Sequence, residues 1–398
     1  MSNFSLPKGF QFAGTYCGIK SSPDREDVSL VVSDQPCTAV GVYTTNVVYA
    51  SAVGRNRTIT PTDNCRVVIA NSGNANTCTG ERGERDTKEM ARLAAEVSGA
   101  MPDQALVMST GIIGEYLPMD KMTAGIRDAA SKLGRKEEHF MAAARGLLTT
   151  DKSHKVSSKS ITLSSGECRI AGMAKGAGMI GPKMATMLCT VTTDAALAPD
   201  DAQAALAHAV DKSFNCISVE GHMSTSDTVL LLASGAAGGD PLTGDDLQSF
   251  RSSLTEVCIE LARMIPDDGE GASHLIDLEI RGCASEQDAF QIAKTVANST
   301  LVKAGIAGCD PNWGRIVSAA GYSGVSFDPG KMSLSLNGFT VFENGEPREF
   351  EETTVSASIR NQRETLVLLQ FGEGSESCRF WTSDLTVEYV RFNSEYHT

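Results

Sequence analysis

Residues 175–194 have the sequence KGAGMIGPKMATMLCTVTTD. Three glycines near its start have the G-x-G-x-x-G spacing of a dinucleotide-binding turn, which needs a strand before the glycines and a helix opening on them. Pro182 follows the glycines directly, and the next residues are rich in β-branched side chains, which favour a strand. A phosphate at this turn would meet no helix N-terminus. We therefore expect a glycine-rich turn that delivers Thr186 to the start of a buried strand.

Thr186 has two interpretations. A threonine at this place is ordinarily a strand-forming residue. Alternatively, its hydroxyl attacks the Ala185 carbonyl, the peptide shifts to an ester, and water releases a new chain that begins at Thr186. The freed α-amino group, with a pKa of about 7.7–8.0, is then a base for the hydroxyl of the same residue. The second interpretation predicts an N-terminal nucleophile made by self-cleavage.

Composition excludes several classes of protein. The chain has 398 residues, of which 41% are hydrophobic and 21% are charged, as is usual for globular proteins. Its apolar runs are shorter than the roughly 20 residues that a membrane helix needs. The 35 basic and 49 acidic residues give a net charge of −14, which disfavours binding to nucleic acid phosphates. We expect neither a membrane span nor a nucleic acid partner.

Cysteine and histidine patterns predict no metal site. The eleven cysteines include no C-x-x-C pair, and the six histidines form no H-E-x-x-H motif. The sequence also lacks the G-x-S-x-G motif of α/β-hydrolases. Cysteines placed singly in apolar runs, such as Cys189 and Cys258, indicate core residues of a reducing compartment. The first 20 residues lack the apolar core of a secretory signal and the arginines of a transit peptide, so we expect a cytoplasmic protein.

Alternation of strand and helix patterns predicts a layered α/β fold. Strand patterns cover residues 27–33, 38–48, 66–70 and 106–108, and a turn-rich loop is expected at residues 71–76. Helical patterns cover residues 86–99, a segment that Pro199 opens, 245–264 and 286–298. About 65 residues at the C-terminal end have the pattern of short strands.

Distinctive motifs continue along nearly the whole chain. They are TTN at residues 44–46, NSGNANTCTG at 71–80, STGIIG at 109–114, TTD at 149–151, the stretch at 175–194, STSDT at 224–228, DGEGA at 268–272, NSTLVK at 298–303, DPNWGR at 310–315 and YVRFNSEYHT at 389–398. In this order they resemble the bifunctional ornithine acetyltransferases (glutamate N-acetyltransferases) of arginine biosynthesis. The sequence differs from the family pattern at residues 220–223, where EGHM replaces a more usual Asp-Gly-Asp-Thr-like run.

The resemblance implies cleavage between Ala185 and Thr186. Two chains, 1–185 and 186–398, would result and stay together in one layered αββα-type sandwich, usually within a higher oligomer. Thr186 would be the nucleophile. The oxyanion hole of the family falls on Thr110 and Gly111, and a hydroxyl and a backbone N–H are apt donors for one developing oxyanion.

The resemblance also implies a set of substrate contacts. They fall on Thr149 (or Thr150, one register away), Lys175, Thr186, Glu270, Asn393 and Thr398. Lys175 is suited to a substrate α-carboxylate and Glu270 to an amino group. Trp313 and Arg315 are motif members that we expect to be structural.

The activity so implied is transfer of acetyl from N2-acetylornithine to glutamate by a ping-pong route through an acetyl-enzyme. It requires no metal or nucleotide, and the sequence leaves open whether acetyl-CoA also serves as a donor. Three alternatives differ in class: a self-processing amidohydrolase or aminopeptidase of the same fold, with water as the acceptor; a dinucleotide-binding oxidoreductase; and an uncut, non-enzymatic protein that binds acetylated amino acids.

Overall fold

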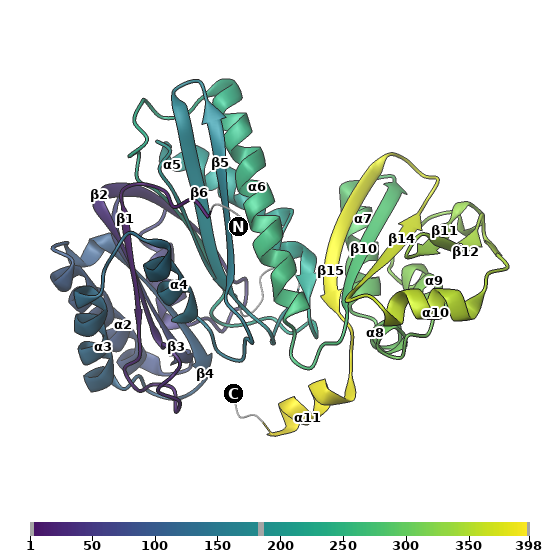
Figure 1. Ribbon diagram of the computed structural model, residues 1–398, viewed down its shortest axis with the longest axis horizontal. Coiled ribbons are helices and arrows are strands. Elements are labelled where there is room, and N and C mark those ends of the chain that lie inside the picture. Colours follow the sequence, from purple (N-terminus) through teal and green to yellow (C-terminus); the bar gives the residue numbers. More distant parts are fainter. Residues whose placement is uncertain (1–3, 182–186, 396–398) are drawn as a thin grey trace.

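The computed structural model describes residues 4–181 and 187–395, which form two lobes (Figure 1). The predicted cleavage site, Ala185 and Thr186, and the predicted substrate residue Thr398 lie outside the described residues. No helix in the described part of the chain has both the length and the apolar character that crossing a membrane would require.

One twisted sheet forms the first lobe. Its strands are β1 (Phe10–Thr15), β2 (Val28–Tyr43), β3 (Thr62–Asn74), β4 (Ala105–Ile112), β5 (Lys155–Leu163), β6 (Gly166–Lys175), β7 (Leu188–Thr193) and β9 (Thr228–Ala233). The strand order is β4-β3-β2-β9-β7-β6-β5, and β1 pairs with β2. The first half of the long strand β2 pairs with β1 and its second half with β9, while β3 pairs along it from Val28 to Ala39. β2 therefore connects two halves of the sheet.

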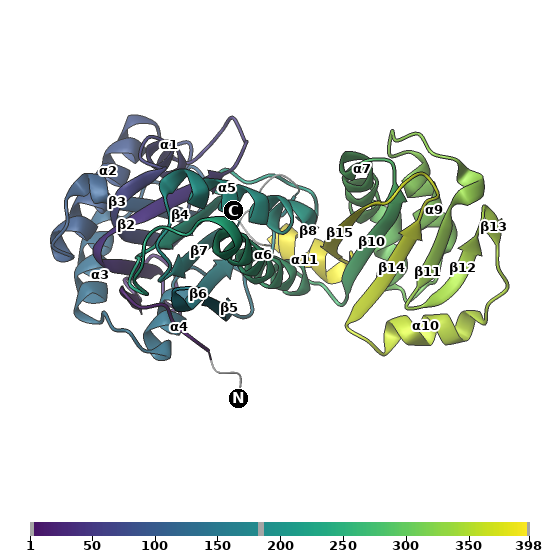
Figure 2. The same ribbon diagram turned by 90° about the horizontal axis from the view of Figure 1, so that it is seen from above.

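Alternating side chains show that these two halves face each other. Val68 of β3 and Leu230 of β9 belong to the same buried apolar cluster between the two halves. The next residues in the chain, Val67 and Leu231, point to the other faces of the sheet. Val67 packs with helices α2 (Gly80–Val97) and α3 (Met119–Ser131). Leu231 packs in the cluster that includes α5 (Pro199–Asp211) and α6 (Gly244–Asp267). Because strand side chains alternate between faces, the order of layers is helix, sheet, sheet, helix (Figure 2), and the predicted αββα-type sandwich is confirmed. The lobe also contains α1 (Ser51–Arg57) and α4 (Glu137–Arg145).

The predicted cleavage site lies inside this sandwich rather than between the lobes. Residues 1–185 include β1 to β6, and residues 186–398 include β7 and β9 of the same sheet. β6 and β7 are antiparallel neighbours, with Lys175 opposite Leu188. The two predicted chains therefore share one hydrogen-bonded sheet.

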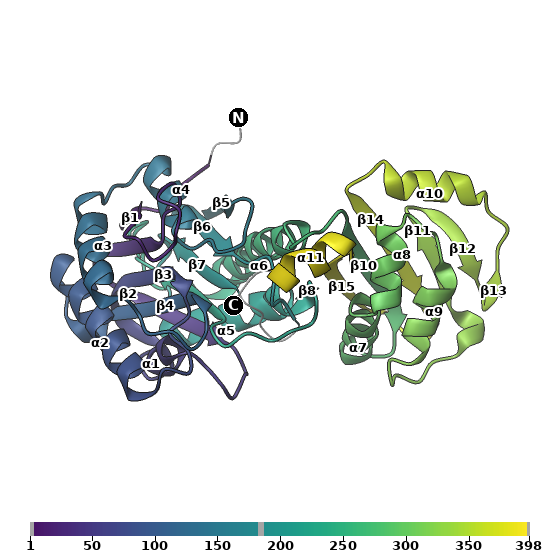
Figure 3. The ribbon, with the colours of Figure 1, turned by 90° about the horizontal axis from the view of Figure 1, so that it is seen from below.

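A second sheet with helices against it forms the other lobe. Its strands are β8 (Ile217–Ser218), β10 (Leu275–Cys283), β11 (Ser333–Leu336), β12 (Phe339–Glu343), β13 (Glu346–Pro347), β14 (Glu364–Gln370) and β15 (Glu376–Ser383), in the order β13-β12-β11-β14-β10-β15-β8. The helices are α7 (Glu286–Ala297), α8 (Thr300–Ala307), α9 (Trp313–Gly321) and α10 (Glu352–Arg360). The last helix, α11 (Val387–Glu395), lies between the lobes (Figure 3).

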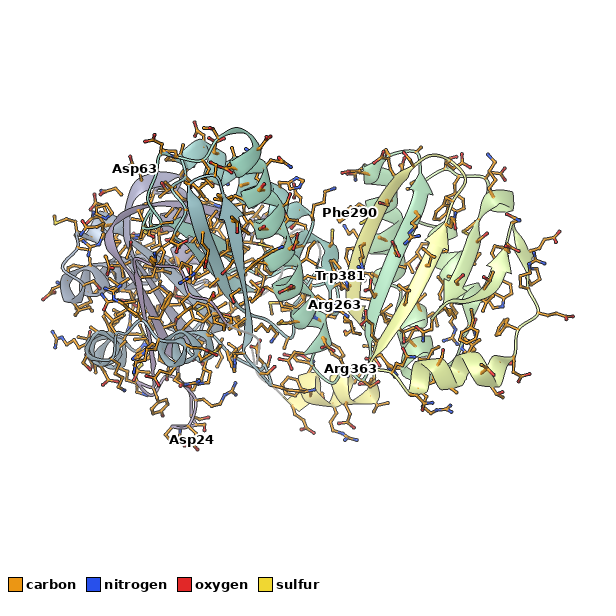
Figure 4. All side chains as sticks on the ribbon, turned by 45° about the horizontal axis from the view of Figure 1, so that its top comes forward. Asp24, Asp63, Arg263, Phe290, Arg363 and Trp381 are labelled. Carbon is orange, nitrogen blue, oxygen red and sulfur yellow. The ribbon has the colours of Figure 1, made fainter. Side chains whose placement is uncertain are left out.

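The lobes are joined by apolar packing and by ion pairs. One buried cluster contains Leu254 of α6 together with Leu278 of β10. At the end of α6, Arg263 forms an ion pair with Glu364, and Arg363 donates to Asp267 at 2.9 Å (Figure 4). These contacts fix the position of the chain where α6 ends, beside the site described below.

The sequence patterns identified most elements correctly. The four expected helices correspond to α2, α5, α6 and α7. The expected loop at residues 71–76 is wrong in its first part, since β3 continues to Asn74. The expectation of strands alone in the C-terminal region is also wrong, because α10 and α11 are helices. α10 buries only Val355 and Ile359, and none of the residues of α11 is buried. Neither helix therefore has the regularly spaced row of apolar residues by which a helix is identified in a sequence.

Candidate functional site

One cavity collects predicted residues from distant parts of the sequence. Its lining includes Thr110, Gly111, Thr149, Glu270 and Asn393. Thr150, the alternative to Thr149, also lines it. Lys175 lies directly beneath this surface, as described below. The structure thus brings together every predicted site residue that it describes, while their individual roles stay predictions.

Thr110 and Gly111 occupy the end of β4. Thr110 is 1% exposed, and its Oγ1 accepts a hydrogen bond from Lys175 Nζ at 3.2 Å. Because the hydroxyl already accepts this bond, its own proton remains for donation to another acceptor. Gly111 has φ +133°, and a Cβ there would lie 2.3 Å from the carbonyl carbon of Gly73. This position therefore requires glycine, and a hydroxyl and a backbone N–H can adjoin there as an oxyanion hole needs.

The motif at residues 71–76 holds this strand end in place. The Asn71 side chain donates to the Asn74 carbonyl at 2.8 Å, and Asn74 Nδ2 donates to the carbonyl of Glu115 at 3.1 Å. The backbone of Ala75 donates to Ile112 at 2.9 Å. Buried amide side chains thus satisfy the irregular backbone beside Gly111. The resemblance identified this motif, but no role could be assigned to it from the sequence alone.

Lys175, at the end of β6, is 1% exposed. Burial lowers the pKa of this lysine, while the carboxylate of Asp151 acts in the opposite direction. Its ammonium group contacts the Thr110 hydroxyl, so a positive charge lies beside the predicted oxyanion hole. The expected contact between Lys175 and a substrate carboxylate stays a prediction.

Glu270, which also lines the cavity, joins three segments. Its Oε1 accepts from Thr150 Oγ1 at 2.6 Å, and its Oε2 accepts from Asn393 Nδ2 at 3.0 Å. Its backbone N–H donates to the carbonyl of Ala177 at 2.9 Å. A Cβ at Gly178 would lie 2.4 Å from the Glu270 carboxyl group. The glycine at position 178 therefore makes room for an acid, and a carboxylate held in this way suits a substrate ammonium group.

In the described residues, the G-x-G-x-x-G turn does not have the strand–turn–helix arrangement of a dinucleotide site. The first element after the turn in the described residues is the strand β7, not a helix. Gly181 packs closely against Gly221, since a Cβ at Gly181 would lie 2.7 Å from the Gly221 backbone. The expectation that a strand follows Thr186 is confirmed. Within the described residues, no group of three or more His, Cys, Asp or Glu side chains could hold a metal ion.

Two acids at the site were not predicted. Glu220 lines the cavity and accepts a hydrogen bond from the backbone of Ile180 at 2.6 Å, and burial raises its pKa to about 8. Asp227 is fully buried, its Oδ1 accepts from the Met187 N–H at 3.2 Å, and burial raises its pKa to about 7. Both lie in segments that the sequence distinguishes, residues 220–223 and the STSDT motif at 224–228, but neither pattern reveals that the acid is buried.

Trp313 and Arg315 lie away from the cavity in α9. The Trp313 ring stacks on Phe342 with centroids 5.2 Å apart, and Arg315 donates to the carbonyl of Leu301 at 3.1 Å. These contacts lie within the second lobe and agree with the structural role expected from the sequence.

Comparisons with known proteins cover almost the whole chain. The model of the ArgJ family matches residues 11–398. The arginine biosynthesis bifunctional protein ArgJ of Rhodopirellula baltica is 48% identical over 99% of this chain and 96% of its own length, and that of Symbiobacterium thermophilum is 44% identical over 99% and 98%. The crystal structure of the ArgJ protein from Bacillus halodurans is 36% identical, covers 52% of this chain and 97% of that chain, and superposes with a TM-score of 0.50. The resemblance found in the sequence is confirmed, and the chain belongs to the ArgJ family.

Proposed function

We propose that this chain is a threonine-nucleophile acyltransferase that moves acetyl from N2-acetylornithine to glutamate in arginine biosynthesis. Membership of the ArgJ family supports an enzyme of the ornithine acetyltransferase type. One observation carries the proposal furthest: Thr110 and Gly111 share a cavity with Glu270, so groups suited to an oxyanion and a group suited to an ammonium ion line the same cavity. N2-acetylornithine needs both, because its acetyl carbonyl becomes an oxyanion and its side-chain amino group carries a positive charge.

Self-cleavage prepares the nucleophile. The Thr186 hydroxyl attacks the Ala185 carbonyl, the peptide nitrogen leaves as the α-amino group of Thr186, and water hydrolyses the resulting ester. The products are chains 1–185 and 186–398. The pairing of β6 with β7 supports their staying together, because the break removes none of the hydrogen bonds between these strands.

The first half-reaction loads the enzyme. The Thr186 hydroxyl attacks the acetyl carbonyl of N2-acetylornithine, and its proton passes to the α-amino group of Thr186. Thr110 and Gly111 donate to the oxyanion of the tetrahedral intermediate. The C–N bond then breaks, the ornithine nitrogen takes the proton, and the acetyl group remains as an ester on Thr186.

The second half-reaction regenerates the hydroxyl. The amino group of glutamate attacks the ester carbonyl and forms a second tetrahedral intermediate at the same two donors. The ester C–O bond breaks, the proton lost by the amino group returns to Thr186, and N-acetylglutamate leaves. In the first half-reaction Glu270 faces the side-chain amino group of N2-acetylornithine, which stays apart from the reacting α-nitrogen. In both half-reactions Lys175 faces a carboxylate, and Thr149, Asn393 and Thr398 complete the contacts.

Mass spectrometry of the purified protein tests this proposal. We expect two chains divided between Ala185 and Thr186, and an acetyl adduct on Thr186 when N2-acetylornithine is added without glutamate. Thr186→Ala should remain uncut and inactive. An intact, inactive wild-type chain would overturn the proposal in favour of a binding protein. Hydrolysis that outpaces transfer to glutamate would instead identify an amidohydrolase, and replacing N2-acetylornithine by acetyl-CoA measures use of the second donor.

A further inference from the structure

Lys155 is a buried cation that the proposed reaction does not use. It lies at the start of β5 and is 1% exposed. Its Nζ is 2.8 Å from Asp151 Oδ1, 2.7 Å from Asp268 Oδ2 and 3.2 Å from the Ser153 carbonyl. An ammonium group has three N–H donors, and this one has three acceptors. A fully paired lysine of this kind is built into the structure rather than left on a surface.

Its two acidic partners each hold backbone of the cavity wall. Asp151 Oδ1 accepts from the Gly176 N–H at 2.6 Å, and its Oδ2 accepts from the Thr149 N–H at 3.0 Å. Asp268 Oδ2 accepts from the Lys152 N–H at 3.0 Å. Burial acts to raise the pKa of Asp151, but the ammonium groups of Lys155 and Lys175 outweigh it and hold that pKa below its usual range. The carboxylate is thus ionised where these backbone bonds need an acceptor.

Lys155 consequently joins three segments that carry predicted site residues. Thr150 precedes Asp151, Lys175 precedes Gly176, and Glu270 follows Asp268 by two residues. The hydrogen bond from Thr150 to Glu270, at 2.6 Å, spans two of the same segments on the cavity side. The ion pairs of Lys155 lie beneath the wall, and this hydrogen bond lies on its surface.

We propose that Lys155 is a positioning residue that sets the affinity of the cavity for its amino acid substrate by fixing Glu270 against Thr150. This inference rests on the proposed function, since it assumes that Glu270 meets a substrate amino group. Lys155 does not touch the substrate. Without its charge, Asp151 and Asp268 would be two like charges in a buried place, and the loops that carry Thr150 and Glu270 would separate.

Binding and kinetics of Lys155→Met test the proposal. We expect ornithine affinity, measured by calorimetry, to fall about tenfold and KM for N2-acetylornithine to rise by about the same factor, because a small misplacement of a polar contact costs this much. We expect kcat to change by less than about threefold, since Thr110 and Gly111 stay on β4. Lys155→Arg, which keeps the charge, should recover part of the affinity.

A double-mutant cycle separates positioning from a general loss of stability. Thr150→Val removes the hydrogen bond to Glu270 directly, so its effect on ornithine affinity should nearly vanish in the Lys155→Met background. Arg379→Met is the control for leaving a buried carboxylate unpaired, because Arg379, although itself exposed, pairs with the fully buried Asp277 in the second lobe. It should lower the melting temperature as Lys155→Met does, with ornithine affinity unchanged.

A further variant keeps the test decisive where Lys155→Met does not fold. Lys155→Met with Asp268→Asn removes one cation and one anion together, and should show the same fall in affinity. Wild-type affinity in either folded variant, or additive effects in the cycle, would overturn the proposal. A wild-type protein that neither binds ornithine nor transfers acetyl would contradict the proposed function instead.

Discussion

The two walls of the cavity are built from different kinds of structure. The strand wall consists of Thr110 and Gly111 at the end of β4, with Lys175 of β6 beneath them. The loop wall consists of Thr150 and Glu270 in connecting segments, together with Asn393 on α11. Thr110 and Lys175 are each 1% exposed, whereas Asn393 is exposed and α11 has no buried residue in its described length.

This difference suggests a division of tasks. The strand wall is held by a sheet ladder and by buried amide side chains, so its donors are fixed before any substrate arrives, as stabilisation of a transition state requires. The loop wall is held by side-chain hydrogen bonds and by the ion pairs of Lys155. We therefore expect changes in the strand wall to lower kcat and changes in the loop wall to raise KM.

The largest effect is expected from Gly111→Ala. A Cβ there would lie 2.3 Å from the backbone of Gly73, at a φ that disfavours any side chain. We expect kcat to fall more than about a thousandfold and the free energy of unfolding to fall by about 3 kcal/mol, as measured by steady-state kinetics and denaturant titration. Gly114→Ala is the control, because its φ is also positive but its Cβ would meet no atom within 4 Å. Equal losses of kcat and of unfolding free energy in both variants would show that backbone strain alone causes the effect of Gly111→Ala.

Thr110→Val should have the next largest effect on kcat. It removes the hydroxyl and leaves Lys175 Nζ without its acceptor at 3.2 Å, while the side-chain volume is nearly unchanged. Loss of one oxyanion donor lowers kcat by about a hundredfold or more. Thr110→Ser keeps the hydroxyl and should retain most of the activity in the same kinetic assay. A large effect confined to KM would place Thr110 in substrate binding instead.

The comparison of walls also shows what could be predicted from sequence. α5, α6 and α7 were predicted because each buries an apolar face at regular spacing. The cavity residues were predicted only through the resemblance to a family, which rests on short motifs that are each contiguous in the chain. The ion pairs of Lys155 could not be predicted, because Asp268 is 113 residues away in the chain and no local sequence pattern connects these two residues. Burial of Glu220 and Asp227 was missed for the same reason, because it arises from tertiary packing.

Glu270→Gln examines the loop wall. It removes the negative charge but keeps an oxygen that can accept from Thr150, so KM for N2-acetylornithine should rise about tenfold with kcat within about twofold. Glu220→Gln in the same cavity is the matched control. Because burial raises the pKa of Glu220 to about 8, its carboxyl group is mostly neutral at pH 7, and an amide changes its charge little. A fall in kcat for Glu270→Gln without a change in KM would contradict the division between the walls.

Asp227→Asn tests a buried proton beside the strand wall. Burial raises the pKa of Asp227 from 3.8 to about 7, so between pH 4 and pH 7 the folded chain holds a proton that the unfolded chain has lost. The contribution of Asp227 to the stability of the wild type is therefore lost as pH rises through this window, and the asparagine variant lacks this contribution. Relative to wild type, the free energy of unfolding of the variant should increase from pH 5 to pH 8 in denaturant titrations. A constant difference would show that Asp227 is ionised throughout.

Asn393→Ala should give the smallest effect. The residue is exposed, and its side-chain amide donates to Glu270 Oε2 at 3.0 Å and to the Tyr389 carbonyl at 3.1 Å. Its loss removes two solvent-accessible hydrogen bonds, each worth about 1 kcal/mol or less. We expect KM for N2-acetylornithine to rise about threefold, with kcat and the melting temperature unchanged. Ser394→Ala is the neighbouring control, because its hydroxyl donates only along α11 to Arg391. A loss of stability in Asn393→Ala would mean that this side chain helps to hold α11 to the cavity, and the loop wall would then depend on the helix as well as on Lys155.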